Sequence, residues 1–250
     1  MAAPSISIIV PTFNEADNIL ELIDRLDAAL AGSSYEIIVV DDDSADGTWR
    51  IVEERATSHP RLIVIRRRNE RGLSSAVLAG MAASRGRTLV TIDADLQHDE
   101  SRIPDLVAAV TEDGADLCLG SREAEGGGYG SWRRRRRLAS WVGARLARLT
   151  LRVPVSDPMS GFFAISRDRY ETVGPLVNPR GFKIMLEFLA RGPRPAVSEV
   201  GYQFGPRLHG TTKLTGLVVW HYLRALASLV RARRRAVPVP PVEGRSASAK

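Results

Sequence analysis

The sequence predicts one α/β domain built on a mainly parallel, doubly wound sheet with helices on both faces. Three observations support this prediction. Short β-branched runs recur along the first half of the chain, amphipathic helical patterns separate them, and 250 residues suffice for a single large core. The 44% hydrophobic and 26% charged content is ordinary for a folded globular protein, so most of the chain should be ordered.

The first half of the chain alternates between expected strands and expected helices. The strands are short runs rich in valine and isoleucine, over residues 5–10, 35–40, 61–65, 88–92 and 116–119. The helices cover residues 16–31, 48–57, 73–84 and 101–111, where apolar residues recur at spacings of three and four. This order predicts that successive strands run parallel.

The second half has a different order of expected elements, because the alternation of strands and helices stops after Gly120. A glycine cluster at residues 126–130 leads into the arginine run 133–137 and a helix expected over residues 132–151. Further strands are expected at 162–166 and 197–204, a helix at 182–190, and a last helix at 214–235. We therefore expect one domain over residues 1–236, followed by a disordered Pro-, Ser- and Ala-rich tail at 237–250.

Charge is divided unevenly between the two halves. Residues 1–120 carry 11 Lys and Arg against 21 Asp and Glu, while residues 121–250 carry 24 against 8. An acidic half can bind a metal ion and a basic half can bind phosphate, so the two halves suit a substrate that carries both metal and phosphate. A nucleic-acid-binding protein is the alternative. The usual base-stacking and groove-reading motifs are absent, so we expect no nucleic-acid partner.

Cellular placement is predicted from what the chain lacks. The amino-terminal apolar run at residues 5–10 is too short for a signal peptide, and no stretch reaches the roughly 18 uninterrupted apolar residues of a membrane span. We expect a cytoplasmic protein that is peripherally associated with the cytoplasmic face of the membrane. The single cysteine, Cys118, excludes an internal disulfide and is expected in the core.

Candidate site residues follow three of the expected strands. In open α/β sheets ligands bind beyond the carboxyl ends of the strands, and here those ends carry Pro11 to Glu15, Asp41-Asp42-Asp43 and Asp93-x-Asp95. The three adjacent carboxylates repel one another, so a ligand or hydrogen-bond donors should compensate them. A charged loop with a helix cap is the alternative for them, and a charge that favours the helix dipole is the alternative for Glu15.

Asp93-x-Asp95 has the spacing of a divalent-cation site. If the chain stays extended there, both carboxylates lie on one face and can address one ion, and Gln97 continues the same spacing. Such hard oxygen ligands select Mg²⁺ or Mn²⁺, with phosphate oxygens filling open positions. A solvated acidic turn is the alternative. P-loop, dinucleotide, zinc-protease and esterase signatures are absent, so those reaction classes lose support.

These motifs, taken in order, resemble the inverting GT-A glycosyltransferases of family 2, and more narrowly the polyprenol (dolichol) phosphate mannose synthases. The resemblance covers about residues 5–225. It is carried by residues 8–15, 39–48 and 93–98, with support from 71–76, 120–122, 155–162, 181–184 and 207–213. Two positions depart from the family pattern: Phe13 stands where Tyr is usual, and Thr212 where Ser is usual before the lysine.

The resemblance implies transfer of mannose from GDP-mannose to a polyprenol monophosphate, with another donor such as UDP-glucose as the alternative. It implies Asp95 and Gln97 as metal ligands and Asp93, Asp95 and Arg122 as catalytic residues. The implied nucleotide-sugar site comprises Pro11, Phe13, Glu15, Val40, Asp42, Asp93, Ala94, Asp95, Gln97, Arg122, Lys183, Arg207 and Lys213.

The acceptor side is predicted from two basic amphipathic helices. Arginines 133–137 precede apolar residues such as Trp141 and Leu149, which is typical of a helix that lies on anionic lipid. The last helix is either a second lipid contact or a core-packing helix with a solvated end. Family relatives often carry membrane spans or use a membrane partner, so a membrane-spanning partner protein is a further possibility that the resemblance implies.

Overall fold

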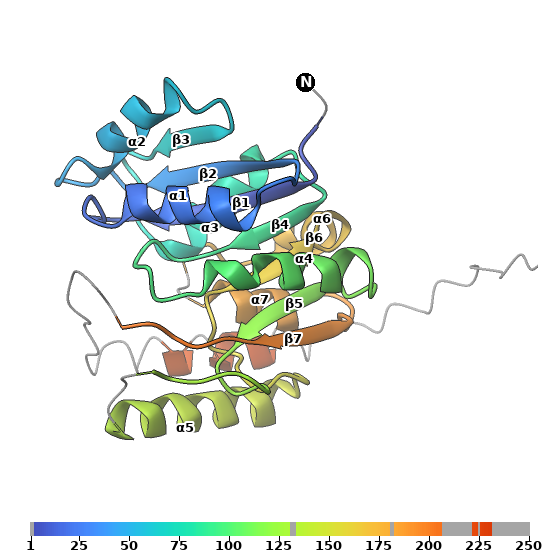
Figure 1. Ribbon diagram of the computed structural model, residues 1–250. Helices are drawn as coiled ribbons and strands as arrows, with labels where there is room; N and C mark the ends of the chain where they lie inside the picture. The colour runs from blue at the N-terminus through green and yellow to red at the C-terminus, as the bar shows by residue number, and fades with distance from the viewer. Residues whose placement is uncertain (1–2, 131–133, 181–182, 207–221, 225, 232–250) are drawn as a thin grey trace, which may run out of the picture.

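The computed structural model contains one seven-stranded sheet with the order β3-β2-β1-β4-β6-β5-β7 (Figure 1). Its strands are β1 (Ile6–Thr12), β2 (Tyr35–Asp41), β3 (Leu62–Arg66), β4 (Thr88–Thr91), β5 (Leu117–Ser121), β6 (Phe163–Ser166) and β7 (Val197–Gly201). Among these strands only β6 is antiparallel to its neighbours, β4 and β5. The other pairings are parallel, which confirms the mainly parallel sheet.

The structure describes residues 3–130, 134–180, 183–206, 222–224 and 226–231. The expected tail at 237–250, and much of the expected last helix, lie outside these residues. Within that helix, residues 222–224 and 226–231 are helical. Of its apolar residues, Leu226 and Leu229 are buried and Leu223 is exposed. The core-packing interpretation therefore holds for Leu226 and Leu229.

Helices cover both faces of the sheet, as the sequence predicts. They are α1 (Ile19–Ala29), α2 (Thr48–Ala56), α3 (Leu73–Ala83), α4 (Ile103–Thr111), α5 (Arg134–Leu151), α6 (Arg167–Val173) and α7 (Ile184–Ala190), with short 3₁₀ turns η1 (Glu100–Arg102) and η2 (Gly174–Leu176). Side chains alternate across a strand, so Ile8 of β1 packs in one cluster with α1 and α4. Ile9 packs on the opposite face with α3, α5 and α7.

Several boundaries differ from the prediction for local reasons. α1 begins at Ile19 instead of residue 16 because the chain first makes a turn, in which Asn14 has a φ of +58°. The amide of Asn14 donates to Ser44 Oγ at 2.9 Å, which ties this turn to the loop after β2. α6 was not predicted, although its cap is readable: the Ser166 side chain accepts from the Arg169 amide.

Candidate active site

A pocket lies at the carboxyl ends of the three neighbouring strands β2, β1 and β4. The pocket is lined by Pro11, Thr12, Phe13, Glu15, Asp42, Leu73, Ala76, Asp93, Ala94 and Asp95. Seven of these belong to the predicted nucleotide-sugar set. The convergence of the three strand ends, which the sequence could only suggest, is therefore present in the fold.

The three adjacent carboxylates after β2 point to different partners. Asp41 accepts from Ser44 and Thr12, with Oδ2 at 2.6 Å and 2.9 Å from their hydroxyls. Asp43 accepts from Arg66 Nε at 2.6 Å. Asp42 lines the pocket and is compensated from within the protein. Its Oδ1 accepts from the buried Arg67, whose Nε lies at 2.7 Å.

The loop that precedes α3 contacts two residues that line the pocket, Asp42 and Phe13. Its Gly72 amide donates to Asp42 Oδ2 at 2.8 Å, and Gly72 has a φ of +141°, a conformation that favours glycine. The Arg71 guanidinium carbon lies 5.0 Å from the centroid of the half-exposed Phe13 ring. The loop therefore places a cation beside the Phe13 ring and helps to fix the Asp42 carboxylate.

Val40 was also predicted for the nucleotide-sugar site. Its side chain is fully buried and packs with Ile38 and Ala76 in the core. Val40 is not among the residues that line this pocket, and its place in a nucleotide site stays a prediction. Glu15 does line the pocket, and its Oε2 accepts from Asn18 Nδ2 at 2.7 Å.

The Asp93-x-Asp95 segment is not extended, so the geometric argument from period two was wrong. β4 ends at Thr91 and the chain turns, with Leu96 at a φ of +58°. Asp93 and Asp95 nevertheless line the same pocket. The turn brings the carboxylates together where an extended strand was expected to do so.

Asp95 and Gln97 fit a hard divalent cation by the chemistry of their donor atoms. Asp95 Oδ1 accepts from the backbone amide of Gln97 at 3.2 Å. The side-chain amide of Gln97 donates from Nε2 to the Gly205 carbonyl at 3.0 Å. That bond orients the side-chain amide of Gln97, whose carbonyl oxygen has the chemistry of a ligand to a hard cation. In the part of the chain that the structure describes, no group of three or more His, Cys, Asp and Glu residues could hold a metal.

His98 supports this turn and is the last residue of the motif at 93–98, in which the sequence assigned it no role. Its ring is buried and stacks on Phe162 with centroids 5.3 Å apart, and Nδ1 accepts from the Asp93 amide at 3.3 Å. Burial lowers the pKa of the imidazole, although the nearby Asp93 and Asp95 raise it. A neutral ring is the form that accepts at Nδ1 while its edge packs among aromatic side chains.

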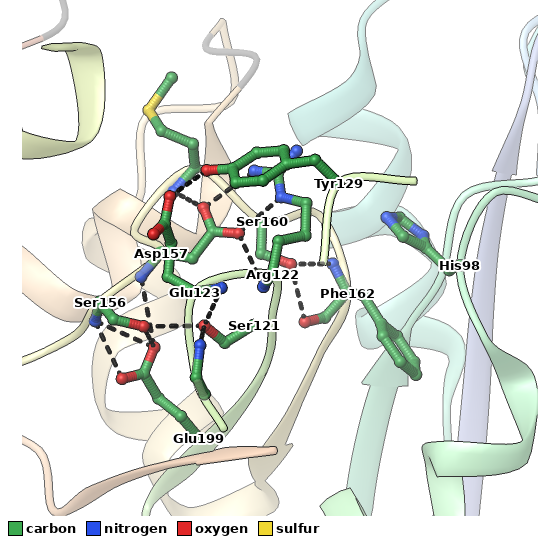
Figure 2. A network of polar contacts seen from close by, with 12 residues as sticks. His98, Ser121, Arg122, Glu123, Tyr129, Ser156, Asp157, Ser160, Phe162 and Glu199 are labelled. Carbon is green, nitrogen blue, oxygen red and sulfur yellow. Dashed lines mark hydrogen bonds and ion pairs between the residues drawn. The ribbon is translucent and has the colours of Figure 1, made fainter. Parts of the chain in front are cut away.

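Arg122 is held by Asp157, a partner that the sequence did not reveal (Figure 2). The guanidinium donates from Nε at 2.6 Å and from Nη2 at 2.8 Å, and both side chains are buried. Burial lowers the pKa of Arg122, but the hydrogen bonds and charge of Asp157 outweigh it and the pKa is raised. The guanidinium carbon also lies 5.3 Å from the Tyr129 ring centroid.

Lys183 lies within electrostatic reach of the same groups. Its Nζ donates to the Met159 carbonyl at 3.2 Å. Burial and the charge of Arg122 lower its pKa to about 8, and the carboxylates of Asp93 and Asp157 oppose that shift. Two other predicted donor-binding residues, Arg207 and Lys213, lie outside the described residues.

The outer face of α5 combines apolar and basic side chains. Leu138, Trp141, Val142 and Leu149 are between 47% and 67% exposed. Arg134, Arg137, Arg145 and Arg148 are exposed along the same helix. We call these eight residues the α5 outer face. On its inner side, α5 buries Ala147 and Leu151 in the core. No helix within the described ranges has the length and apolarity to cross a bilayer.

Comparison with protein families and with individual relatives gives three findings. The family model described as Glycosyl transferase family 2 matches residues 7–174. The dolichol-phosphate mannosyltransferase of Pyrococcus furiosus is 42% identical over 228 residues, which are 90% of this chain and 64% of that protein. The dolichol-phosphate mannosyltransferase of Saccharomyces cerevisiae is 41% identical over 234 residues, 89% of this chain and 86% of that protein.

Among solved structures, the fold is similar to that of glucosyl-3-phosphoglycerate synthase from Mycobacterium tuberculosis, in complex with Mn²⁺, UDP-glucose and phosphoglyceric acid. The TM-score is 0.69 at 23% identity, over 92% of this chain and 79% of that chain. At this identity the likeness concerns the fold.

Proposed function

Because this chain belongs to glycosyl transferase family 2, we propose that it transfers mannose from GDP-mannose to the phosphate of a polyprenol lipid, with inversion. The names of relatives at 41% and 42% identity support this choice of substrates. The observation that carries the proposal is the pocket at the strand ends, where Asp42, Asp93 and Asp95 line one cavity.

The proposed acceptor brings its own nucleophile. A phosphate monoester has a second pKa of about 6, so it is mostly dianionic at neutral pH. One of its oxygens forms the bond to the anomeric carbon, and the bond from that carbon to the β-phosphate oxygen breaks. GDP leaves with the electron pair. Since no proton has to be removed from the nucleophile, the reaction needs no general base.

The task of the protein is then to hold both substrates and to balance charge on the departing diphosphate. We propose that Asp95 and Gln97 hold Mg²⁺ or Mn²⁺, which when bound would neutralise part of that charge. Arg122 and Lys183 are proposed to supply further positive charge, and Lys183 interacts electrostatically with Asp93. From the family pattern, Arg207 and Lys213 are proposed to contact the donor as well.

A transfer assay tests this function. The purified protein is incubated with labelled GDP-mannose, Mg²⁺ and polyprenol phosphate, and the organic-extractable product is counted. UDP-glucose in place of GDP-mannose serves as the matched donor control. Transfer from GDP-mannose alone supports the proposal, and transfer from UDP-glucose alone assigns the other donor. Absence of product from every donor contradicts the activity.

We also propose that the α5 outer face lies on the cytoplasmic surface of a membrane. Its exposed leucines and tryptophan would enter the headgroup region, and its arginines would contact anionic lipid. Such contact would bring the pocket to a lipid acceptor that stays in the bilayer.

Vesicle sedimentation tests this contact. The variant Trp141→Ala/Leu149→Ala should bind vesicles containing anionic phosphatidylglycerol less than the wild type does. Leu20→Ala is the matched control, because Leu20 is a similarly exposed apolar residue on α1. Equal binding of all three proteins, or equal binding to neutral vesicles, contradicts this surface.

A further inference from the structure

Glu199 of β7 anchors a loop backbone at the edge of the site. Its Oε1 accepts from the Ser156 amide at 3.0 Å, the Ser156 hydroxyl at 2.8 Å and the Asp157 amide at 3.3 Å (Figure 2). Its Oε2 accepts from the Ser156 amide at 2.9 Å. Two successive backbone N–H groups therefore point at one carboxylate, which fixes the peptide orientation at both residues.

A second link joins this anchor to the end of β5. The hydroxyls of Ser156 and Ser121 lie 2.8 Å apart. Ser121 Oγ also accepts from the amides of Glu123 and Ala124, at 3.2 Å and 3.1 Å. Ser121 directly precedes Arg122, so the anchored loop is tied both to the backbone beside Arg122 and, through Asp157, to its side chain.

The anchored loop, residues 156–161, touches three of the groups assigned to the donor site. Asp157 binds the Arg122 guanidinium, and the Met159 carbonyl accepts from Lys183. Gly161 packs on Asp93 so closely that a Cβ at this glycine would lie 3.0 Å from Asp93 Oδ2. One loop thus sets the relative positions of two cations and a carboxylate.

We propose that Glu199 is a positioning residue of the transfer reaction, which acts by holding loop 156–161 and through it Arg122. The inference rests on the proposed function. Glu199 acts on the reaction through its bonds to Ser156 and Asp157, and Asp157 in turn holds Arg122. Loss of its carboxylate frees the peptide at Ser156, and the Arg122 guanidinium loses its fixed direction.

The test compares Glu199→Gln with Glu36→Gln. Glu36 is a matched control because it also lies on a strand and accepts from a serine hydroxyl and a backbone amide, Ser7 Oγ and Arg85 N, each at 2.7 Å. Glu36 is near the amino end of β2, whereas the pocket lies at the carboxyl end of that strand. For each variant, kcat, the donor KM and the melting temperature are measured.

Misplacement of a catalytic group by about 1 Å can cost about 100-fold in rate. We therefore expect Glu199→Gln to lower kcat by roughly 10- to 100-fold with little change in donor KM. Glu36→Gln should lower the melting temperature and leave kcat near the wild-type value. Glu199→Asp should recover part of kcat, because it restores the charge. Ser156→Ala should cause a smaller loss, since both backbone amides still reach the carboxylate.

A wild-type kcat in Glu199→Gln, or an equal loss of kcat in Glu36→Gln, overturns the inference. If Glu199→Gln does not fold, the variants Glu199→Asp and Ser156→Ala test the positioning role instead. A wild-type kcat in both of these variants also overturns the inference. These outcomes differ from failure of the proposed function, in which the wild-type protein transfers no sugar. In that case the positioning role falls together with the function.

Discussion

Replacement of Asp157 by asparagine tests the buried ion pair that holds Arg122. The two side chains are 1% and 6% exposed, and two short hydrogen bonds join them at 2.6 Å and 2.8 Å. Asparagine has nearly the same shape but no charge, and its amide group can accept with only one oxygen. Arg122 would keep its charge in a buried site with no full counter-charge. Breaking a buried pair in this way costs about 3–5 kcal/mol.

The expected change in melting temperature follows from this energy. For chains of this size 1 kcal/mol corresponds to about 2–4 °C, so Asp157→Asn should melt roughly 6–20 °C below the wild type. Differential scanning calorimetry at pH 7 measures the shift, and the sugar-transfer assay should show a large loss of activity. Asp24→Asn is the control, because the Arg55–Asp24 pair is 40% and 63% exposed and should contribute at most about 1 kcal/mol.

The double variant Arg122→Met/Asp157→Leu separates folding from catalysis. Removing both charges also removes the penalty of the unpaired arginine, so stability should recover relative to Asp157→Asn while transfer stays lost. If Asp157→Asn melts no lower than Asp24→Asn, the pair is not buried as described and the reasoning is refuted.

Three further predictions follow from individual side chains. Asp95→Ala should reduce transfer by about 100-fold or more in the labelled-sugar assay, and near wild-type transfer would contradict the metal assignment. Burial raises the pKa of Cys118 to about 11, so native protein at pH 8 should not react with a thiol reagent that reacts promptly after denaturation. Burial raises the pKa of the Glu36 carboxyl, but hydrogen bonds from Arg85 and Ser7 outweigh burial, so the pKa is lowered from its ordinary value of 4.5. The ionised Glu36 carboxylate therefore stabilises the fold above the pKa of the unfolded state, and this stabilisation is lost as acid protonates the carboxylate. The difference in melting temperature between the wild type and Glu36→Gln should shrink as pH falls below about 4.

The sequence was sufficient where local pattern and chain order determine the outcome. The short β-branched runs identified the first five strands, and strand–helix alternation predicted a mainly parallel sheet. The carboxylates that follow the strands were also predicted, because their positions at the strand ends follow from the local pattern. The three ends met in one pocket because β1 lies between β2 and β4.

Pairings between distant segments could not be predicted. Asp157 lies 35 residues from Arg122, and Glu199 lies 43 residues from Ser156. The first pair meets because β6 lies beside β5, and the second because β7 lies on the other side of β5, an order that no local pattern encodes. The turn after β4 was missed for another reason: it needs a positive φ at Leu96, where leucine gives no signal.

The reversed direction of β6 has a consequence for how the pocket is built. In a wholly parallel sheet, only the segments that leave strands reach the carboxyl rim. β6 runs the other way, so the segment that enters it, residues 156–161, arrives at that rim as well. Chain insertions just before β6 should therefore be as harmful to activity as insertions just after β1 or β4, whereas the equivalent positions before the parallel strands face the opposite rim.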